Sequence, residues 1–298
     1  MKKIPPTRRF RPRQVQGKQL NYNARTLGDY KRTLKAMVYQ MRATLEKELF
    51  PLLSTEESKK FFKDRQAFAS DSKTSSDILT VSQLLADRFN AGFTEAALGV
   101  ASKMVGQQIS ASATAVNRTL KQMGAEVTLT SGIVPERVAD VGAQAIQTNI
   151  DLIKSIPVEY MQRVNKTLVD AISSGGDIST IKDTLYESGA ITERRAKNIA
   201  DDQVRKSYNA VNAVTLKSVG VKKFRWLHSG GGQHPRQSHI AMSGEVFSFD
   251  DLPVINQENV DRGYEGPEQG IPGQAYNCRC TMGPVFDFEE DDNANNKP

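Results

Sequence analysis

The chemically distinctive residues of this chain gather at one end, and this uneven distribution constrains the fold more than any other feature. All three histidines, both cysteines and the single tryptophan lie between Lys222 and Val285 of the 298-residue sequence. The residues before this segment contain none of them and follow long, polar, helix-like patterns. We therefore expect a small compact module near the carboxy-terminal end and a helical scaffold ahead of it.

Composition limits the size of the core and the class of the protein. Hydrophobic residues make up 38% of the chain and aromatic residues 7%, which is less than most globular proteins carry. No apolar run is long enough to cross a membrane. The basic amino-terminal end is not followed by the apolar segment of a secretory signal.

Positive charge is concentrated at the start of the chain. The net charge of the whole sequence is +6, but residues 1–45 carry twelve lysines and arginines against the single acid Asp29. Residues 1–25 contain prolines and cations without apolar periodicity, so we expect a basic extended arm, with a plain disordered tail as the alternative. In this arm we expect contacts to nucleic acid or an acidic partner from Lys2, Lys3, Arg8, Arg9, Arg11, Arg13 and Lys18. Residues 287–298 form an acidic tail that we interpret as a solvated end.

Helical periodicity dominates residues 26–219. We expect a helical docking region over residues 26–130, in which the first helix ends near Pro51 and Asn90 to Gly92 break a later one. Residues 131–219 are expected to continue as helices with new starts at Pro157 and near Gly189. The predicted fold class is a mainly α amino-terminal and central region with a small carboxy-terminal α+β module.

The module itself is assigned to residues 220–286. An alternating run after Gly220 predicts one strand, the segment from Gly244 predicts a second, and Asn277 to Met282 predicts a third. In that third strand Cys278 and Cys280 would face one side and Arg279 the other.

A zinc site is one interpretation of the rare residues in this module. Two cysteines separated by one residue cannot form an unstrained disulfide, so we expect free thiols in a reducing environment. Imidazole and thiolate are zinc ligands, and a loop-rich module gains stability from such an ion. The four candidate ligands are His234, His239, Cys278 and Cys280. In the other interpretation no cofactor is bound, the cysteines are small buried apolar residues and the histidines make ordinary hydrogen bonds.

Catalytic interpretations are weaker because no spacing is diagnostic. Cys278 with His239 would form a nucleophile pair. A metal held by His234, His239 and Asp250 or Asp251 would suit phosphodiester cleavage. We therefore expect a protein that is not an enzyme, with a metal-dependent nuclease as an alternative.

Several motifs in order along the chain resemble the phage minor head protein family, whose members include the phage Mu F-like and SPP1 gene product 7-like head morphogenesis proteins. The resemblance covers roughly residues 135–286 and is strongest over 190–286. It is carried by Arg194-Arg195-Ala196, Asn209 and Asn212, Trp226, Pro235-Arg236 with His239, Gly244 with Phe247, and Asn277-Cys278-Arg279-Cys280. The last of these motifs is the most specific, and the set marks Trp226, Arg236, His239, Gly244 and residues 277–280 as a structural motif.

This resemblance implies a virion component made in the host cytoplasm and placed inside the phage head near the portal vertex. It implies the portal protein, the major capsid or scaffolding protein and packaged double-stranded DNA as partners. An ADP-ribosyltransferase-like module is an enzymatic alternative, although Glu289 and Glu290 are more simply part of the acidic tail. A free DNA-binding protein is a third interpretation.

Overall fold

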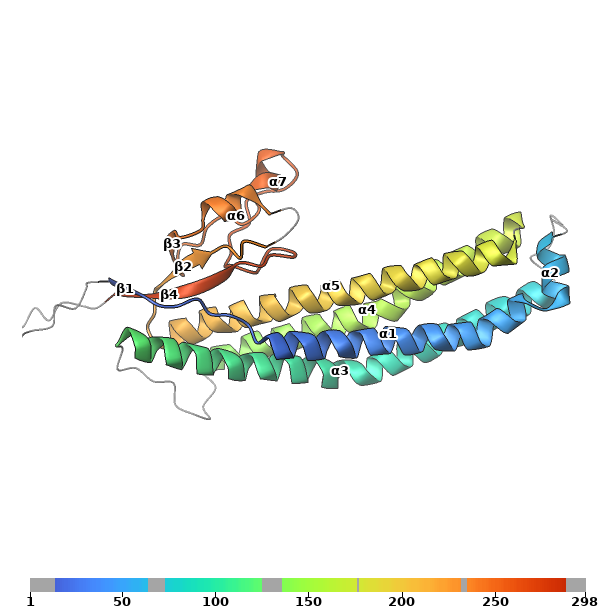
Figure 1. Ribbon diagram of the computed structural model, residues 1–298, viewed down its shortest axis with the longest axis horizontal. Coiled ribbons are helices and arrows are strands. Elements are labelled where there is room, and N and C mark those ends of the chain that lie inside the picture. Colours follow the sequence, from blue (N-terminus) through green and yellow to red (C-terminus); the bar gives the residue numbers. More distant parts are fainter. Residues whose placement is uncertain (1–13, 64–72, 125–135, 176, 232–234, 288–298) are drawn as a thin grey trace, which may run out of the picture. The chain divides into compact units, whose positions relative to one another are not determined.

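The computed structural model describes residues 14–63, 73–124, 136–175, 177–231 and 235–287 (Figure 1). These described residues are 72% helical and contain seven helices and one four-stranded antiparallel sheet. The predicted fold class is confirmed. By their contacts the residues form two compact units, one of residues 23–108 and 140–207 and the other of residues 1–22, 109–139 and 208–298. We call them the helical unit and the sheet unit.

The helical unit is built from long helices that run alongside one another (Figure 1). It contains α1 (Ala24–Leu53), α2 (Glu56–Lys63) and large parts of α3 (Lys73–Met123), α4 (Glu136–Ser174) and α5 (Ile178–Ser218). The remaining ends of α3, α4 and α5 belong to the sheet unit.

Helix α1 shows how the sequence pattern produces this unit. Asn23 begins the helix, and its side-chain oxygen accepts a hydrogen bond from the Arg25 backbone N–H at 2.9 Å. One face is buried at intervals of three and four residues, which is the helical period that the sequence predicted. The buried residues of this stripe are Leu34, Val38, Met41, Leu45 and Leu49.

Buried polar groups also join helices within this unit. The Tyr30 hydroxyl of α1 donates to Asn149 Oδ1 of α4 at 2.7 Å, and Asn149 Nδ2 reaches Gln203 Oε1 of α5 at 3.4 Å. A partly exposed ion pair adds to these contacts, since Lys35 of α1 pairs with Glu193 of α5 at 2.7 Å. Because these contacts require particular partners, they fix the register of the helices as apolar packing alone does not.

Three expected helix breaks are absent. Helix α3 passes through Gly92, α4 through Pro157 and α5 through Gly189. A proline inside a helix costs about 3 kcal/mol, but apolar residues on both sides of Pro157 are buried and keep α4 continuous. Gly189 lies where the Arg42 side chain occupies the space a Cβ would need. Packing against other helices therefore overrides the local signals.

The sheet unit has strand order β1-β4-β2-β3, all antiparallel. The strands are β1 (Gln14–Gln16), β2 (Lys223–Leu227), β3 (Val246–Ser248) and β4 (Thr281–Asp287). Two short helices, α6 (Gln237–Ala241) and α7 (Gln257–Asp261), lie between the strands in sequence. The first two expected strands of the module are confirmed as β2 and β3.

Part of the predicted basic arm is an edge strand of this sheet. Val15 pairs with Phe286, and the Gly17 and Leu20 backbone N–H groups donate to carbonyls of β4 at 2.7 and 2.9 Å. Leu20 is 1% exposed and belongs to the core. Six of the seven cations expected to contact DNA lie in residues 1–13, outside the described residues, and Lys18 is exposed.

The third expected strand is displaced. Residues 277–280 form a turn and an extended segment, and strand pairing begins only at Thr281. The sequence was misleading because Gly283 and Pro284 usually end a strand. Here Pro284 lies in a central strand beside Phe224 of β2, and its carbonyl accepts from Gly17.

The core of the sheet unit combines strands with helix ends. Phe224 and Trp226 point inward from β2, while Val116 and Leu120 come from α3 and Tyr208 and Leu216 from α5. Cys278 and Cys280 are part of the same core.

None of the helices in the described part of the chain combines the length and apolar composition that crossing a bilayer requires. The five consecutive segments expected from the sequence stay a prediction.

Candidate functional site

The Asn277–Cys280 segment directs two thiols into the core of the sheet unit. Asn277 has a positive φ of 55°, and the Cys278 backbone N–H closes a turn onto the Ala275 carbonyl at 3.0 Å. Cys278 and Cys280 are buried and the intervening Arg279 is exposed. The alternation expected for a strand is therefore present, although the segment itself precedes β4.

Helix α6 brings His239 to the same place. The helix is short, and its amino-terminal end is held by Glu258 of α7, whose Oε1 accepts from both the backbone N–H and the hydroxyl of Ser238 at 2.9 and 2.8 Å. His239 is 2% exposed. Its Nε2 lies 2.9 Å from the Ile255 carbonyl oxygen. Because a carbonyl can only accept, Nε2 carries a proton, and in the neutral ring the Nδ1 lone pair is free.

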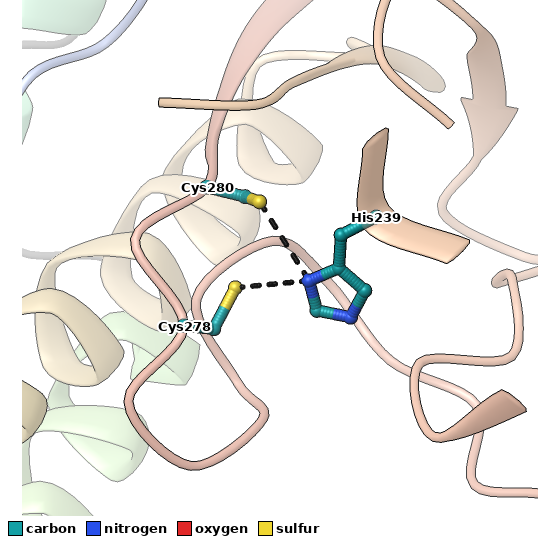
Figure 2. A group of neighbouring side chains, drawn as sticks. All are labelled: His239, Cys278 and Cys280. Carbon is teal, nitrogen blue, oxygen red and sulfur yellow. Dashed lines mark hydrogen bonds between the residues drawn. The ribbon is translucent and has the colours of Figure 1, made fainter. Parts of the chain in front are cut away.

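His239, Cys278 and Cys280 converge on one point (Figure 2). Nδ1 of His239 lies 3.4 Å from Cys278 Sγ and 3.7 Å from Cys280 Sγ. The three donor atoms all lie within 4.8 Å of one another. Both cysteines are free. We call these three residues the His–Cys cluster.

The pKa values of the two thiols are shifted in opposite directions because the thiols interact with each other. The hydrogen bond from Cys280 lowers the pKa of Cys278 to about 4, with His239 adding to the effect against the opposing influence of burial. The same hydrogen bond, together with burial, raises the pKa of Cys280. The cluster therefore favours one thiolate, located on Cys278.

The histidine responds to that thiolate. Burial alone would lower the pKa of His239, and the positive charge of Arg236 acts in the same direction. The hydrogen bonds to Cys278 and the Ile255 carbonyl outweigh these effects, so the pKa of His239 is raised.

Two buried side chains next to the cluster come from the expected motifs. The Trp226 ring packs edge-on against His239, with ring centroids 5.1 Å apart. Its Nε1 has no hydrogen-bond partner in the described structure, yet it is close enough to Cys280 to lower the pKa of that thiol. Asn209 of α5 donates to the Cys280 carbonyl at 3.2 Å. The cluster is thus enclosed by β2 on one side and anchored to α5 on another.

The remaining motif residues have structural positions. Arg236 Nη2 donates to the Tyr276 carbonyl at 3.0 Å and so joins the start of α6 to the loop before Asn277. Gly244 has a φ of 96° and donates its N–H to the Trp226 carbonyl at 2.8 Å, which joins the turn before β3 to the end of β2.

Other predicted ligands lie elsewhere. His234 is outside the described residues. The remaining histidine, His228, accepts from the Gly230 N–H with its Nδ1. Asp250 pairs with Lys217 at 3.2 Å, and neither it nor Asp251 joins the cluster identified among the described residues. Glu258 and the Ile255 carbonyl could not be recognised in the sequence, because contacts to a backbone carbonyl or a helix end across a loop leave no motif.

The arrangement of the three donor atoms suits the binding of an ion between them better than nucleophilic attack on a substrate. Thiolate and imidazole are the functional groups of a nucleophile pair, but here all three side chains are at most 3% exposed. A nucleophile has to be reached by its substrate. A buried set of two sulfurs and one nitrogen can instead serve as a ligand set. Metal binding itself stays a prediction.

Comparison with known proteins places this site within a family segment. Residues 162–283 match the family model described as Phage Mu protein F like protein, and the resemblance inferred from the motifs is confirmed over that segment. A protein of Haemophilus influenzae described as an uncharacterized protein is 31% identical over 142 residues. That match covers 48% of this chain and 29% of the length of the relative. No solved structure matches the chain.

Proposed function

We propose that this chain, whose residues 162–283 match the Phage Mu protein F like family, is a minor head protein of a tailed bacteriophage. In this proposal it is a structural virion protein that docks at the portal inside the head and contacts packaged DNA during assembly or ejection. The family match is the observation that carries the proposal, and it supports a role in phage head morphogenesis. Docking at the portal and contact with DNA go beyond that match.

The surface of the helical unit supports docking onto another head protein. Large apolar side chains remain exposed there, among them Tyr39 at 71%, Leu98 at 60% and Leu84 at 58%. Leu84 and Leu98 are fourteen residues apart on α3, which is close to four full turns, so they lie on the same side of the helix. Burial of such side chains against a partner would stabilise the complex.

The start of the chain supports contact with DNA. Lys2, Lys3, Arg8, Arg9, Arg11 and Arg13 directly precede β1, which is anchored to the edge of the sheet. Six cations within thirteen residues are opposite in charge to the phosphates of duplex DNA, and binding releases the counterions of the phosphates that they neutralise.

The portal contact is tested with the full chain and the assembled portal ring of the same phage. Leu84→Glu combined with Leu98→Glu should weaken binding at least tenfold and leave the melting temperature nearly unchanged, because both side chains are exposed. Tyr264→Glu is the matched control, an exposed apolar residue of the sheet unit. Docking through this face of α3 is contradicted if the α3 variant binds like the control. No binding of the wild-type chain to the ring contradicts the portal proposal altogether.

The DNA contact is tested by deleting residues 1–13 and no more. A deletion up to residue 25 would also remove β1 and the core residue Leu20, so a loss of binding would have no clear cause. The slope of the logarithm of the duplex-binding constant against the logarithm of the salt concentration should become less negative by about 5 if all six cations neutralise phosphates. An unchanged salt slope in the deletion would show that the arm has another partner.

A further inference from the structure

We propose that His239, Cys278 and Cys280 supply three of the four ligands of one tetrahedral Zn²⁺ ion that ties α6 to the segment before β4. This inference goes beyond the proposed function, since neither the family match nor head assembly requires a metal. It rests on the orientation of the three side chains (Figure 2) and on their burial.

Two sulfurs face the same nitrogen atom of His239. Nε2 of His239 is occupied by the Ile255 carbonyl, so the imidazole has only Nδ1 to offer the two thiols. Both sulfurs nevertheless approach this atom, at 3.4 and 3.7 Å. Nδ1 can make one good hydrogen bond, to one of the two sulfurs, whereas a cation located between the three atoms would interact with all of them.

The distances between the nitrogen and the two sulfurs fit a zinc ion. A tetrahedral zinc ion with Zn–S of about 2.3 Å and Zn–N of about 2.0–2.1 Å places sulfur and nitrogen about 3.5 Å apart. The two observed nitrogen–sulfur distances lie on either side of this value. The ligand atoms would therefore have to move little to coordinate the ion.

The groups around the three side chains also suit a metal site. The Ile255 carbonyl orients the imidazole, as a hydrogen bond to the second ring nitrogen does in most histidine–metal sites. Trp226 Nε1 is a buried N–H beside Cys280 that has no hydrogen-bond partner among the described residues, and a metal-bound thiolate accepts such a hydrogen bond better than a thiol does. Two thiolates and an imidazole favour Zn²⁺ over Mg²⁺ or Ca²⁺, which prefer oxygen ligands.

A metal would also have a structural reason to be there. Helices α6 and α7 have five residues each, and they belong to a long loop-rich stretch between β2 and β4. His239 and the two cysteines are about forty residues apart in sequence. An ion that joins them would add a cross-link to the apolar contacts that Phe249 and Ile255 make with the core.

The test is the metal content and the cobalt spectrum of the full-length protein, purified from zinc-supplemented culture without a histidine tag. We expect about one zinc per chain and, after replacement by Co²⁺, thiolate-to-cobalt charge-transfer absorption. His239→Ala, Cys278→Ser and Cys280→Ser should each reduce both signals, and chelation should lower the wild-type melting temperature by about 5 °C or more. His228→Ala, at a histidine of the same module outside the cluster, should retain both signals.

Three results would overturn the proposal. One is wild-type protein that holds less than about a tenth of an equivalent of zinc after reconstitution. Another is cobalt binding without the charge-transfer absorption, which would place the metal away from the thiols. The third is metal retained in all three cluster variants. The first two use the wild-type chain, so they decide the matter even if a variant fails to fold.

Discussion

Asn277 positions the two cysteines through a single backbone angle. Its φ of 55° lies in the left-handed region, which asparagine and glycine adopt more readily than other residues. The turn that it forms is closed by the hydrogen bond from Cys278 to Ala275. The asparagine of the Asn-Cys-Arg-Cys motif is therefore explained by backbone conformation.

Comparison of two substitutions isolates this conformational effect. Both Asn277→Gly and Asn277→Ala remove the side-chain contacts, but only alanine is strained at positive φ. We expect the alanine variant to be less stable than the glycine variant by about 1 kcal/mol, measured by denaturant unfolding. Equal stabilities would show that the angle is not what the motif preserves.

At the scale of residues, the sequence identified the three side chains of the His–Cys cluster but not the groups that hold them in place. It predicted that His239 and the two cysteines belong together, because rare residues gathered in one module. It did not reveal Glu258 at the end of α6 or the Ile255 carbonyl beside His239. These contacts depend on how a long loop folds back, and periodicity carries no information about that.

At the scale of elements, packing decides between continuity and breakage. Gly92 and Pro157 were expected to interrupt helices, yet both lie inside continuous ones. The short strand β1 was not expected, because Gln14-Val15-Gln16 is polar and its partner β4 lies near the other end of the sequence. Local signals thus located α1 and β2 but failed where a distant partner determines the outcome.

Two glycine-to-alanine substitutions should have opposite effects on stability. At Gly17 a Cβ would lie 2.6 Å from Thr119 Cγ2, 2.7 Å from Met123 Sδ and 2.8 Å from Pro284 Cγ, so we expect Gly17→Ala to destabilise. The cost should be about 1–3 kcal/mol. At Gly92 a Cβ meets no atom within 4 Å, so Gly92→Ala should stabilise α3 by about 0.5–1 kcal/mol. Thermal unfolding of both variants checks this, and a Gly17→Ala protein as stable as the wild type would contradict the docking of β1.

The contact between α1 and α5 should be sensitive to acid. The hydrogen bond from Lys35 lowers the pKa of Glu193, and the charges of Lys35 and Arg42 add to it against the effect of burial. A lowered folded-state pKa means that the stabilisation is present above the ordinary glutamate pKa and is lost as the pH falls through the folded-state value. Because Glu193 is 39% exposed, the contribution at neutral pH should be less than about 1 kcal/mol.

Glu193→Gln tests this directly. The variant should be slightly less stable than the wild type at about pH 7, and the difference should shrink at an acidic pH below the ordinary glutamate pKa. Urea unfolding at both values measures it. A difference that does not depend on pH would mean that the carboxylate charge is not what joins the helices.

At the scale of the whole molecule, chain order and spatial order differ. The sheet unit takes its edge strand from the start of the chain, core residues from the ends of α3 and α5, and its remaining strands from the carboxy-terminal third. The family segment, residues 162–283, includes parts of both units. The sequence predicted the fold class and the family resemblance, but it could not show that residues 14–20 complete the carboxy-terminal module.

The most direct test of the proposed function is a cryo-electron microscopy map of procapsids and mature heads from the same phage, combined with mass spectrometry of the purified particles. We expect the polypeptide in the particles at low copy number, with density for the helical unit against the portal on the inner side of the head. Particles that lack the chain at every stage, or density for it only on the outer capsid surface, would contradict the proposal.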